Sequence, residues 1–140
     1  TGLVGRTLHA RGYRLISGCD LSEIMIDKAG ASQVYKRLYP NTDLTQPLPD
    51  DLPRNFDAVV CCGAFIPTHL PATALRNLIA MTRPGGVVVV SIREAYYTTD
   101  GFEALLQTLV HEQGLSVLQT KLSASYLQNA RAHYLALQVA

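Results

Sequence analysis

The sequence predicts an α/β fold in which a doubly wound, mostly parallel sheet is closed by an antiparallel hairpin at the C-terminus. Short apolar segments alternate with amphipathic ones along most of the 140 residues, as strands and helices do in parallel sheets. Residues 56–63 and 87–92 are almost continuously apolar, which is typical of strands covered on both faces. The last two apolar segments have no helical segment between them, so they should pair antiparallel.

The first half of the chain should contain two helices and two strands. The expected elements are a helix over residues 2–12, a strand over 14–19, a helix over 22–30, a strand over 33–39 and a proline-rich loop over 44–55. Ser22 is the predicted N-cap of the second helix, because its hydroxyl can accept a first-turn N–H and the acid Glu23 follows it. Gly30 should end this helix.

The second half should supply the remaining strands. The expected elements are a strand over residues 56–63, a helix opening at Pro71, a turn over 83–86, a strand over 87–92, a helix ending at Gly114, and strands over 115–122 and 132–139. Leu75, Leu78 and Ile79 share one face of the first of these helices. Asp100 and Glu103 have the spacing of a capping box at the start of the second.

Composition limits the classes of function. Twelve Lys and Arg stand against eleven Asp and Glu, so general nucleic-acid binding is not expected. The longest apolar run, residues 58–66, is far shorter than the ~18 residues that a membrane helix needs, and no membrane association is predicted.

The cysteines and histidines bear on compartment and metal binding. The chain has three cysteines, Cys19, Cys61 and Cys62, and their spacing matches neither a disulfide framework nor a zinc site. An odd number of cysteines without such spacing indicates a reducing compartment and a cytoplasmic location. We expect the three cysteines to be small buried hydrophobic residues. The histidines show no metal-ligand spacing either, so no metal site is predicted.

In a doubly wound sheet the ligand site lies at the carboxyl ends of the strands. This rule selects Thr1, Gly2, Asp20, Asp43 and the stretches 63–67 and 94–97. Asp20 follows Gly2 by 18 residues, with one helix and one strand between them. In nucleotide-binding folds a glycine loop opens the first helix, and an acid about 20 residues later accepts the ribose hydroxyls. The alternative for Asp20 is a helix cap or an ordinary loop acid.

Several segments, taken in order, resemble the class I S-adenosylmethionine-dependent methyltransferases. Residues 1–5 (TGLVG) resemble the end of their glycine loop, and residues 18–22 (GCDLS) resemble their Gly-x-Asp-hydrophobic-Ser segment. Further similarity lies in Asp43-Leu44, in residues 56–60 (FDAVV) and in residues 83–86 (RPGG). Residues 63–69 and 90–94 are similar, more narrowly, to the methyltransferase-like proteins named for the Williams-Beuren syndrome region.

The resemblance implies a Rossmann-like fold and S-adenosyl-L-methionine as cofactor. It places Thr1 and Gly2 beside the methionine part, Asp20 on the ribose, Leu21 and Met25 against the adenine, Asp43 on the adenine amino group and Leu44 against the ring. Gly63 is added to the cofactor-binding candidates because it lies at a strand end. The alternative for Leu21, Met25 and Leu44 is core packing, and for Asp43 it is a turn in which the carboxylate caps the backbone.

The cofactor itself activates the methyl group, so the protein has chiefly to position an acceptor away from water. Where a general base is needed, the candidates near the strand ends are His69, Glu94, Tyr96 and Tyr97. His69 has a surface role at a helix entry as its alternative, and the two tyrosines have lid packing as theirs.

We therefore expect methyl transfer to an unidentified acceptor, most simply a small molecule. The rival functions are an NAD(P)-dependent Rossmann oxidoreductase, which shares the glycine loop and the acid, and a non-catalytic cofactor-binding module. The acceptor atom and the oligomeric state are not predictable from the sequence.

The resemblance also implies that the first, central strand of the sheet and most of the glycine loop lie before Thr1. Residues 1–140 would then be one methyltransferase domain that is incomplete at its N-terminus and that binds the cofactor poorly by itself. We expect either a gap between the strands 14–19 and 56–63 or a compensating rearrangement.

Overall fold

The computed structural model describes residues 1–99, 101–126 and 129–140. The chain divides into two compact units, residues 1–52 and residues 53–140, and the strands fall into two separate sheets. Each unit is described by itself.

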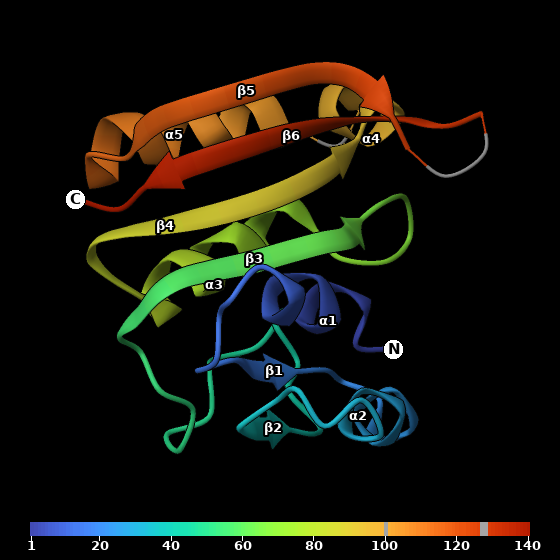
Figure 1. Cartoon of the computed structure of the whole chain (residues 1–140). Coiled ribbons are helices and arrows are strands. Elements are labelled where there is room, and N and C mark those ends of the chain that lie inside the picture. The colour runs from blue at the N-terminus through green and yellow to red at the C-terminus, as the bar shows by residue number, and fades with distance from the viewer. Residues whose placement is uncertain (100, 127–128) are drawn as a thin grey trace. The chain divides into compact units, whose positions relative to one another are not determined.

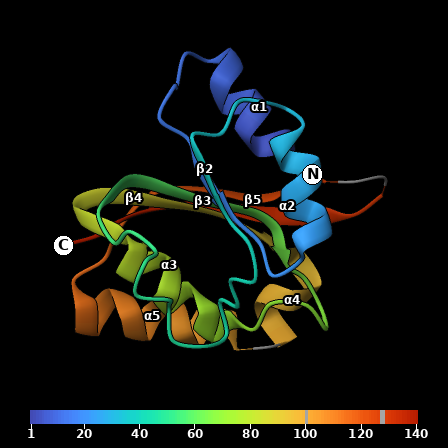
Figure 2. The same ribbon diagram turned by 90° about the horizontal axis from the view of Figure 1, so that it is seen from below.

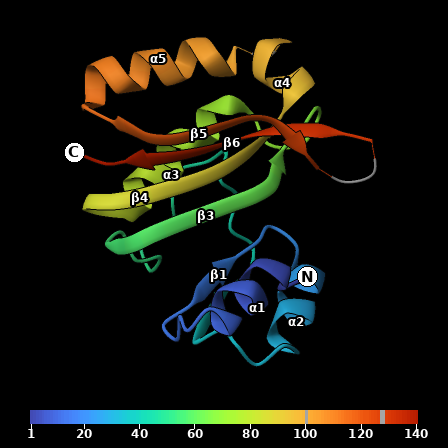
Figure 3. The ribbon, with the colours of Figure 1, turned by 45° about the horizontal axis from the view of Figure 1, so that its top comes forward.

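The first unit pairs two short parallel strands with two helices. Its elements are α1 (Leu3–Ala10), β1 (Ser17–Cys19), α2 (Glu23–Gly30) and β2 (Arg37–Tyr39). Ser17 lies opposite Arg37, and Cys19 lies opposite Tyr39. Figure 3 shows both helices next to this small sheet. The order of helix and strand is the predicted one.

Two local features set the limits of these elements. The Ser22 hydroxyl accepts the Met25 N–H at 3.4 Å, so the predicted N-cap of α2 is confirmed. The strand expected over residues 33–39 begins only at Arg37. Gln33 has a φ of 56°, a left-handed conformation that does not fit an extended strand.

The second unit contains a four-stranded sheet in the order β3-β4-β6-β5. The strands are β3 (Phe56–Phe65), β4 (Thr82–Arg93), β5 (Ser116–Ser125) and β6 (Arg131–Gln138). β3 and β4 are parallel, whereas β6 runs antiparallel to both β4 and β5. Figure 1 shows β4 and β6 at the centre of this sheet. The predicted C-terminal antiparallel hairpin is confirmed.

The helical elements of the second unit lie on one face of its sheet (Figure 2). They are the 3-10 turn η1 (Ala72–Ala74), α3 (Leu75–Met81), α4 (Glu94–Thr99) and α5 (Phe102–Gln113). Val88, Val90 and Ile92 of β4 are fully buried. The rings of Phe65 and Phe102 pack edge to face, with centroids 5.1 Å apart. This core holds the carboxyl ends of β3 and β4 in place.

Several expectations about this unit need correction. Residues 94–99 form a short helix of their own, an element that was not among those expected between the strand over 87–92 and the helix ending at Gly114. Since its own helices cover one face, β3 is not buried on both: Ala58 and Cys62 are exposed. The cysteines are therefore not small buried hydrophobic residues, because Cys62 lies at the surface and the other two are only partly covered.

The N-cap of helix α5 is Gly101. Asp100, which was expected to take part in a capping box there, lies outside the described residues.

The turn expected over residues 83–86 is a bulge within β4. Phe56 of β3 lies opposite Thr82 of β4, and Ala58 lies opposite Val87. One residue of β3 therefore matches four residues of β4, which bulge out of the strand pairing. Arg83 Nε donates to Asp57 Oδ1 at 2.7 Å across this bulge. Both side chains are exposed, so the ion pair contributes little to stability.

Strand β5 forms one outer edge of the sheet. Its side chains are largely exposed, among them Val117, Leu118 and Leu122. Lys121 lies between these apolar residues in the strand. The outer strand thus exposes apolar side chains with one charged residue among them.

The expected gap between the strands 14–19 and 56–63 is found in the described residues. Residues 3–10 are helical, and β1 and β3 belong to different sheets. Among the described residues, no helix has the length and apolar character needed to cross a membrane.

Candidate functional site

A small cavity of about 80 Å³ lies in the first unit. It is lined by Thr1, Gly2, Gly18, Cys19, Asp20, Met25, Ile26, Ala29, Tyr35 and Leu38. Four of the predicted cofactor residues are thus brought together, namely Thr1, Gly2, Asp20 and Met25. They come from the start of α1, the end of β1 and the first turn of α2.

Gly2 is the N-cap of α1 and adopts a φ of 79°, a conformation that glycine enters without strain. Its carbonyl accepts the Arg6 N–H at 3.0 Å, which closes the first turn of the helix. The N-terminal end of α1, the positive end of its dipole, therefore begins at the cavity. This end suits an anionic or polar ligand group.

Asp20 is fixed by its backbone as well as by its side chain. Its N–H donates to the Tyr39 carbonyl at 3.2 Å, and its own carbonyl accepts the Thr42 N–H at 3.1 Å. Its Oδ1 accepts the Ser22 N–H at 2.9 Å. A carboxylate has acceptor sites on both oxygens, so a loop role and a ligand role are compatible in this residue.

Cys19 lies beside Asp20 in the cavity lining. Partial burial, and then the negative charge of Asp20, raise the pKa of the Cys19 thiol. The thiol is therefore neutral near pH 7 and is not poised as a nucleophile, since the thiolate is the reactive form.

The remaining predicted cofactor residues of this unit do not line the cavity. Leu21 is 61% exposed, and Leu44 is partly covered. Asp43 Oδ1 accepts from Thr45 twice, from its hydroxyl at 2.7 Å and its N–H at 2.8 Å. These hydrogen bonds lower the pKa of Asp43. Asp43 thus adopts the alternative named above, a turn in which the carboxylate caps the backbone. Its contact with the adenine stays a prediction.

Sequence reasoning missed six of the residues that line the cavity. Gly18 and Cys19 could have been found, because they precede Asp20 on the same strand. Ile26 and Ala29 follow Met25 at helical spacing on α2. Tyr35 and Leu38 carry no sequence signal for this position, since only the folded chain brings them to the cavity.

Gly63 lies in the second unit, near the end of β3. Its N–H donates to Ser91 Oγ at 2.9 Å. A Cβ added at Gly63 would lie 3.0 Å from Tyr126 Oη. Partial burial raises the pKa of the neighbouring Tyr134, and Cys62 and Tyr126 raise it further. A group of hydroxyl and thiol side chains, which the sequence did not predict, therefore surrounds this strand end.

The four candidates for a general base also lie in the second unit, and two of them have clear structural roles. Tyr96 is 5% exposed, and its hydroxyl donates to the Leu70 carbonyl at 2.8 Å. The ring of Tyr97 packs edge-on against His133, with centroids 4.8 Å apart. Burial, and then the charge of Glu103, raise the pKa of Tyr97, which disfavours a tyrosinate base.

His69 and Glu94 are the other two candidates. The His69 side chain is exposed, and its N–H donates to the Ile66 carbonyl at 3.2 Å within a turn. Glu94 is partly covered and is the first residue of α4. Both are open enough to meet a substrate, and their catalytic role stays a prediction.

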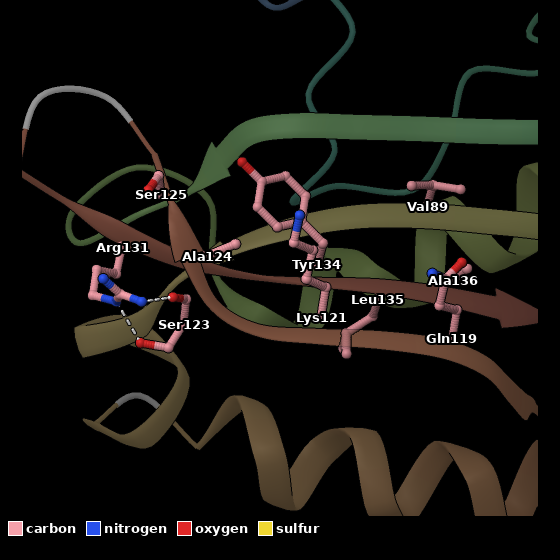
Figure 4. A pocket seen from close by; sticks show the side chains of 10 residues that line it. All are labelled: Val89, Gln119, Lys121, Ser123, Ala124, Ser125, Arg131, Tyr134, Leu135 and Ala136. Carbon is pink, nitrogen blue, oxygen red and sulfur yellow. Dashed lines mark hydrogen bonds between the residues drawn. The ribbon is translucent and has the colours of Figure 1, made fainter.

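The second unit also has a larger groove of about 580 Å³ on its sheet. Its lining, shown in Figure 4, consists of Val89, Gln119, Lys121, Ser123, Ala124, Ser125, Arg131, Tyr134, Leu135 and Ala136. Arg131 Nε donates to Ser123 Oγ at 2.6 Å, and Nη2 donates to the Ser123 carbonyl. None of the predicted site residues lines this groove. Within the described ranges, no group of three or more His, Cys, Asp or Glu could hold a metal ion.

Comparison with known proteins shows the family of the chain. The sequence model of the methyltransferase domain family matches residues 1–88, which is more than half of the chain. The chain therefore belongs to the methyltransferase domain family, and the resemblance seen in the sequence is confirmed at this level. Human methyltransferase-like protein 27 is 37% identical over 109 residues, which make up 78% of this chain and 44% of that protein. The chain thus spans less than half the length of this relative.

Solved structures show the same fold. A TehB-like SAM-dependent methyltransferase from Corynebacterium glutamicum superposes with a TM-score of 0.72 at 19% identity, covering 99% of this chain and 75% of that one. The N-methyltransferase NodS from Bradyrhizobium japonicum, in complex with S-adenosyl-l-homocysteine, gives a TM-score of 0.70 at 18% identity and covers 99% and 72%. The predicted Rossmann-like fold class is confirmed.

Proposed function

We propose that this chain carries the cofactor site of an enzyme that transfers a methyl group from S-adenosyl-L-methionine to a small-molecule acceptor. One observation carries the proposal. Thr1, Gly2, Asp20 and Met25 come from three separate elements and line one cavity, within the residues that match the methyltransferase domain family. The similar NodS structure contains S-adenosyl-l-homocysteine, the demethylated form of the same cofactor.

The chemistry of the lining suits this cofactor. The Asp20 carboxylate would accept from the ribose hydroxyls, the α1 N-terminus at Gly2 would face the methionine part, and Met25 would pack on the adenine. The cavity is smaller than the roughly 300 Å³ at which ligand pockets begin, so by itself it would hold only part of the cofactor. The bound cofactor supplies an activated methyl group, and the protein's task is to hold the acceptor in line and exclude water.

The proposal extends to the compartment, the partners and the domain organisation of the protein. Cys19, Cys61 and Cys62 form no disulfide, which fits the reducing cytoplasm. The nearly balanced charge supports a partner other than nucleic acid. We also propose that residues 1–140 belong to one methyltransferase domain.

A titration separates this function from its two rivals. Isothermal calorimetry with S-adenosyl-l-homocysteine and with NAD should give binding of the first ligand alone. Binding of NAD alone would favour an oxidoreductase. Cofactor binding without methyl transfer to any acceptor in a broad panel would favour a non-catalytic module. Mass spectrometry of a ligand that co-purifies with the protein would identify the acceptor class directly.

Replacement of Asp20 tests the proposed ribose contact. Asp20→Ala should weaken S-adenosyl-l-homocysteine binding at least about tenfold, because two ribose hydroxyls lose a charged acceptor. Asp27→Ala, at an exposed position on α2, is the matched control and should bind normally. Asp20→Asn keeps an acceptor for the Ser22 N–H, so it separates loss of the carboxylate from loss of the loop. Unchanged affinity in Asp20→Ala would remove this residue from the site.

A further inference from the structure

We propose that Tyr35 is a positioning residue of the cofactor site, one that fixes the N-terminus of α1 relative to Asp20. This inference rests on the proposed function, because it assigns a role at the same cavity. Tyr35 lines that cavity together with Gly2, Gly18 and Asp20. It lies between α2 and β2 in the sequence, outside every segment that carried the family resemblance.

The first observation is a hydrogen bond that ties two distant segments. The Gly5 N–H donates to Tyr35 Oη at 3.1 Å, across 30 residues of sequence. Gly5 belongs to the first turn of α1, where backbone N–H groups have no partner inside the helix. The N-cap residue, Gly2, has no side chain that could accept them. The tyrosine hydroxyl therefore performs the task that a capping side chain performs elsewhere.

The second observation is the close fit of the Tyr35 ring against two glycines. A Cβ added at Gly5 would lie 2.3 Å from Cζ and Oη of Tyr35. A Cβ added at Gly18 would lie 2.9 Å from its Cε1. Since real Cβ atoms do not approach so closely, only glycine at both positions leaves room for the ring. Tyr35 thus packs against α1 on one side and against β1 on the other.

These contacts give the ring a geometrical role. Gly5 lies three residues beyond Gly2, and Gly18 lies two residues before Asp20. The ring therefore sets the separation between the helix N-terminus and the carboxylate, the two groups that the proposed function assigns to opposite parts of the cofactor. Preorganised groups lower the cost of ordering a site on binding, so displacement of the ring should weaken binding.

The first experiment removes the hydroxyl and keeps the ring. Tyr35→Phe should speed hydrogen exchange of the Gly5 amide, measured by NMR, and should weaken S-adenosyl-l-homocysteine binding about three- to tenfold, the effect of one neutral hydrogen bond. Tyr13→Phe is the matched control, because Tyr13 is 62% exposed, and it should change neither value. Both affinities are measured well below the melting temperature, where a loss of stability alone would not alter binding.

The second experiment tests the ring itself. It compares several variants, so its outcome does not depend on the folding of any one of them. Gly18→Ala should weaken binding in the otherwise unchanged chain, because its new methyl group displaces the ring. In a Tyr35→Ala background the same change should have a much smaller effect, since the ring is gone and only the end of the Leu38 side chain, 3.1 Å from the added Cβ, remains close. Additive effects of the two substitutions would overturn the proposal.

The outcomes also separate this inference from the proposed function. If Tyr35→Phe binds S-adenosyl-l-homocysteine as tightly as the unchanged chain, Tyr35 has no positioning role and the proposed function stands. If Tyr13→Phe weakens binding as much as Tyr35→Phe, the effect is not specific and the inference is also overturned. If the unchanged chain binds neither S-adenosyl-l-homocysteine nor S-adenosyl-L-methionine, the proposed function fails and the inference fails with it.

Discussion

Asp20 and Asp43 show why residue spacing alone does not distinguish a binding acid from a turn acid. Each carboxylate accepts the backbone N–H of the residue two positions later, Ser22 at 2.9 Å and Thr45 at 2.8 Å. This local geometry is favoured by aspartate at any strand end that leads into a turn. What separates the two acids is their tertiary surroundings, because only Asp20 lines the cavity.

The pKa of Asp43 gives a residue-scale prediction. Thr45→Val removes the hydroxyl donor and keeps the backbone donor, so the pKa of Asp43 should rise toward its ordinary value. The measurement is a carboxyl ¹³C titration by NMR. In the unchanged chain this carboxyl adds stability above its unfolded-state pKa, and the contribution is lost as pH falls through the lower folded-state value. An unaltered titration in Thr45→Val would mean that the backbone hydrogen bond alone lowers the pKa.

The candidate site could be predicted in part. Thr1, Gly2, Asp20 and Met25 follow from the positions of strand ends and helix starts, which are local features of the sequence. Leu21 has the same motif support, yet it lies in the bend between β1 and α2 and its side chain is 61% exposed. Tyr35 could not be predicted, since its position depends on two glycines that lie far from it in sequence.

At the scale of elements, capping and periodicity were reliable guides. Ser22 begins α2, Gly114 ends α5 in a left-handed conformation, and the stripe Leu75, Leu78 and Ile79 is buried. No comparable signal marks α4 in the sequence, because residues 94–99 lack an apolar stripe of helical period. Strand β2 was predicted too long, because β-branched and aromatic residues before Arg37 suggested a strand, whereas Gln33 is left-handed and the strand begins only at Arg37.

The N-cap of α2 supplies a prediction for an element. Ser22→Ala should lower the free energy of unfolding of the chain by up to about 1 kcal/mol, because the Met25 N–H loses its side-chain acceptor. The hydrogen bond is long, at 3.4 Å, so the lower part of this range is expected. Ser22→Asp retains an acceptor and should preserve stability. Urea unfolding curves measure both variants, and equal losses in the two would show that the cap contributes nothing.

At the scale of the whole molecule, the two sheets differ in size and in how well their backbone amides are protected from solvent. β4 is paired on both sides, and Val88 and Val90 are fully buried. β1 and β2 are three residues long and pair with each other. Stability within a protein follows such differences in burial and pairing.

Native-state hydrogen exchange tests this difference. The amides of β4 should exchange about tenfold or more slowly than those of β1, because opening β4 breaks two strand pairs and exposes a core. The matched comparison is between Val88 and Gly18, each at the middle of its strand. Equal protection at the two positions would mean that the units unfold together as one cooperative structure.

Strand β5 has a consequence for the behaviour of the protein at high concentration. An outer strand offers unpaired backbone donors and acceptors to the same strand of another copy, and apolar side chains such as Val117 and Leu122 favour that addition. Lys121 opposes it, because stacked copies would bring like charges together. The ammonium group of Lys121 therefore acts against edge-to-edge association through this strand.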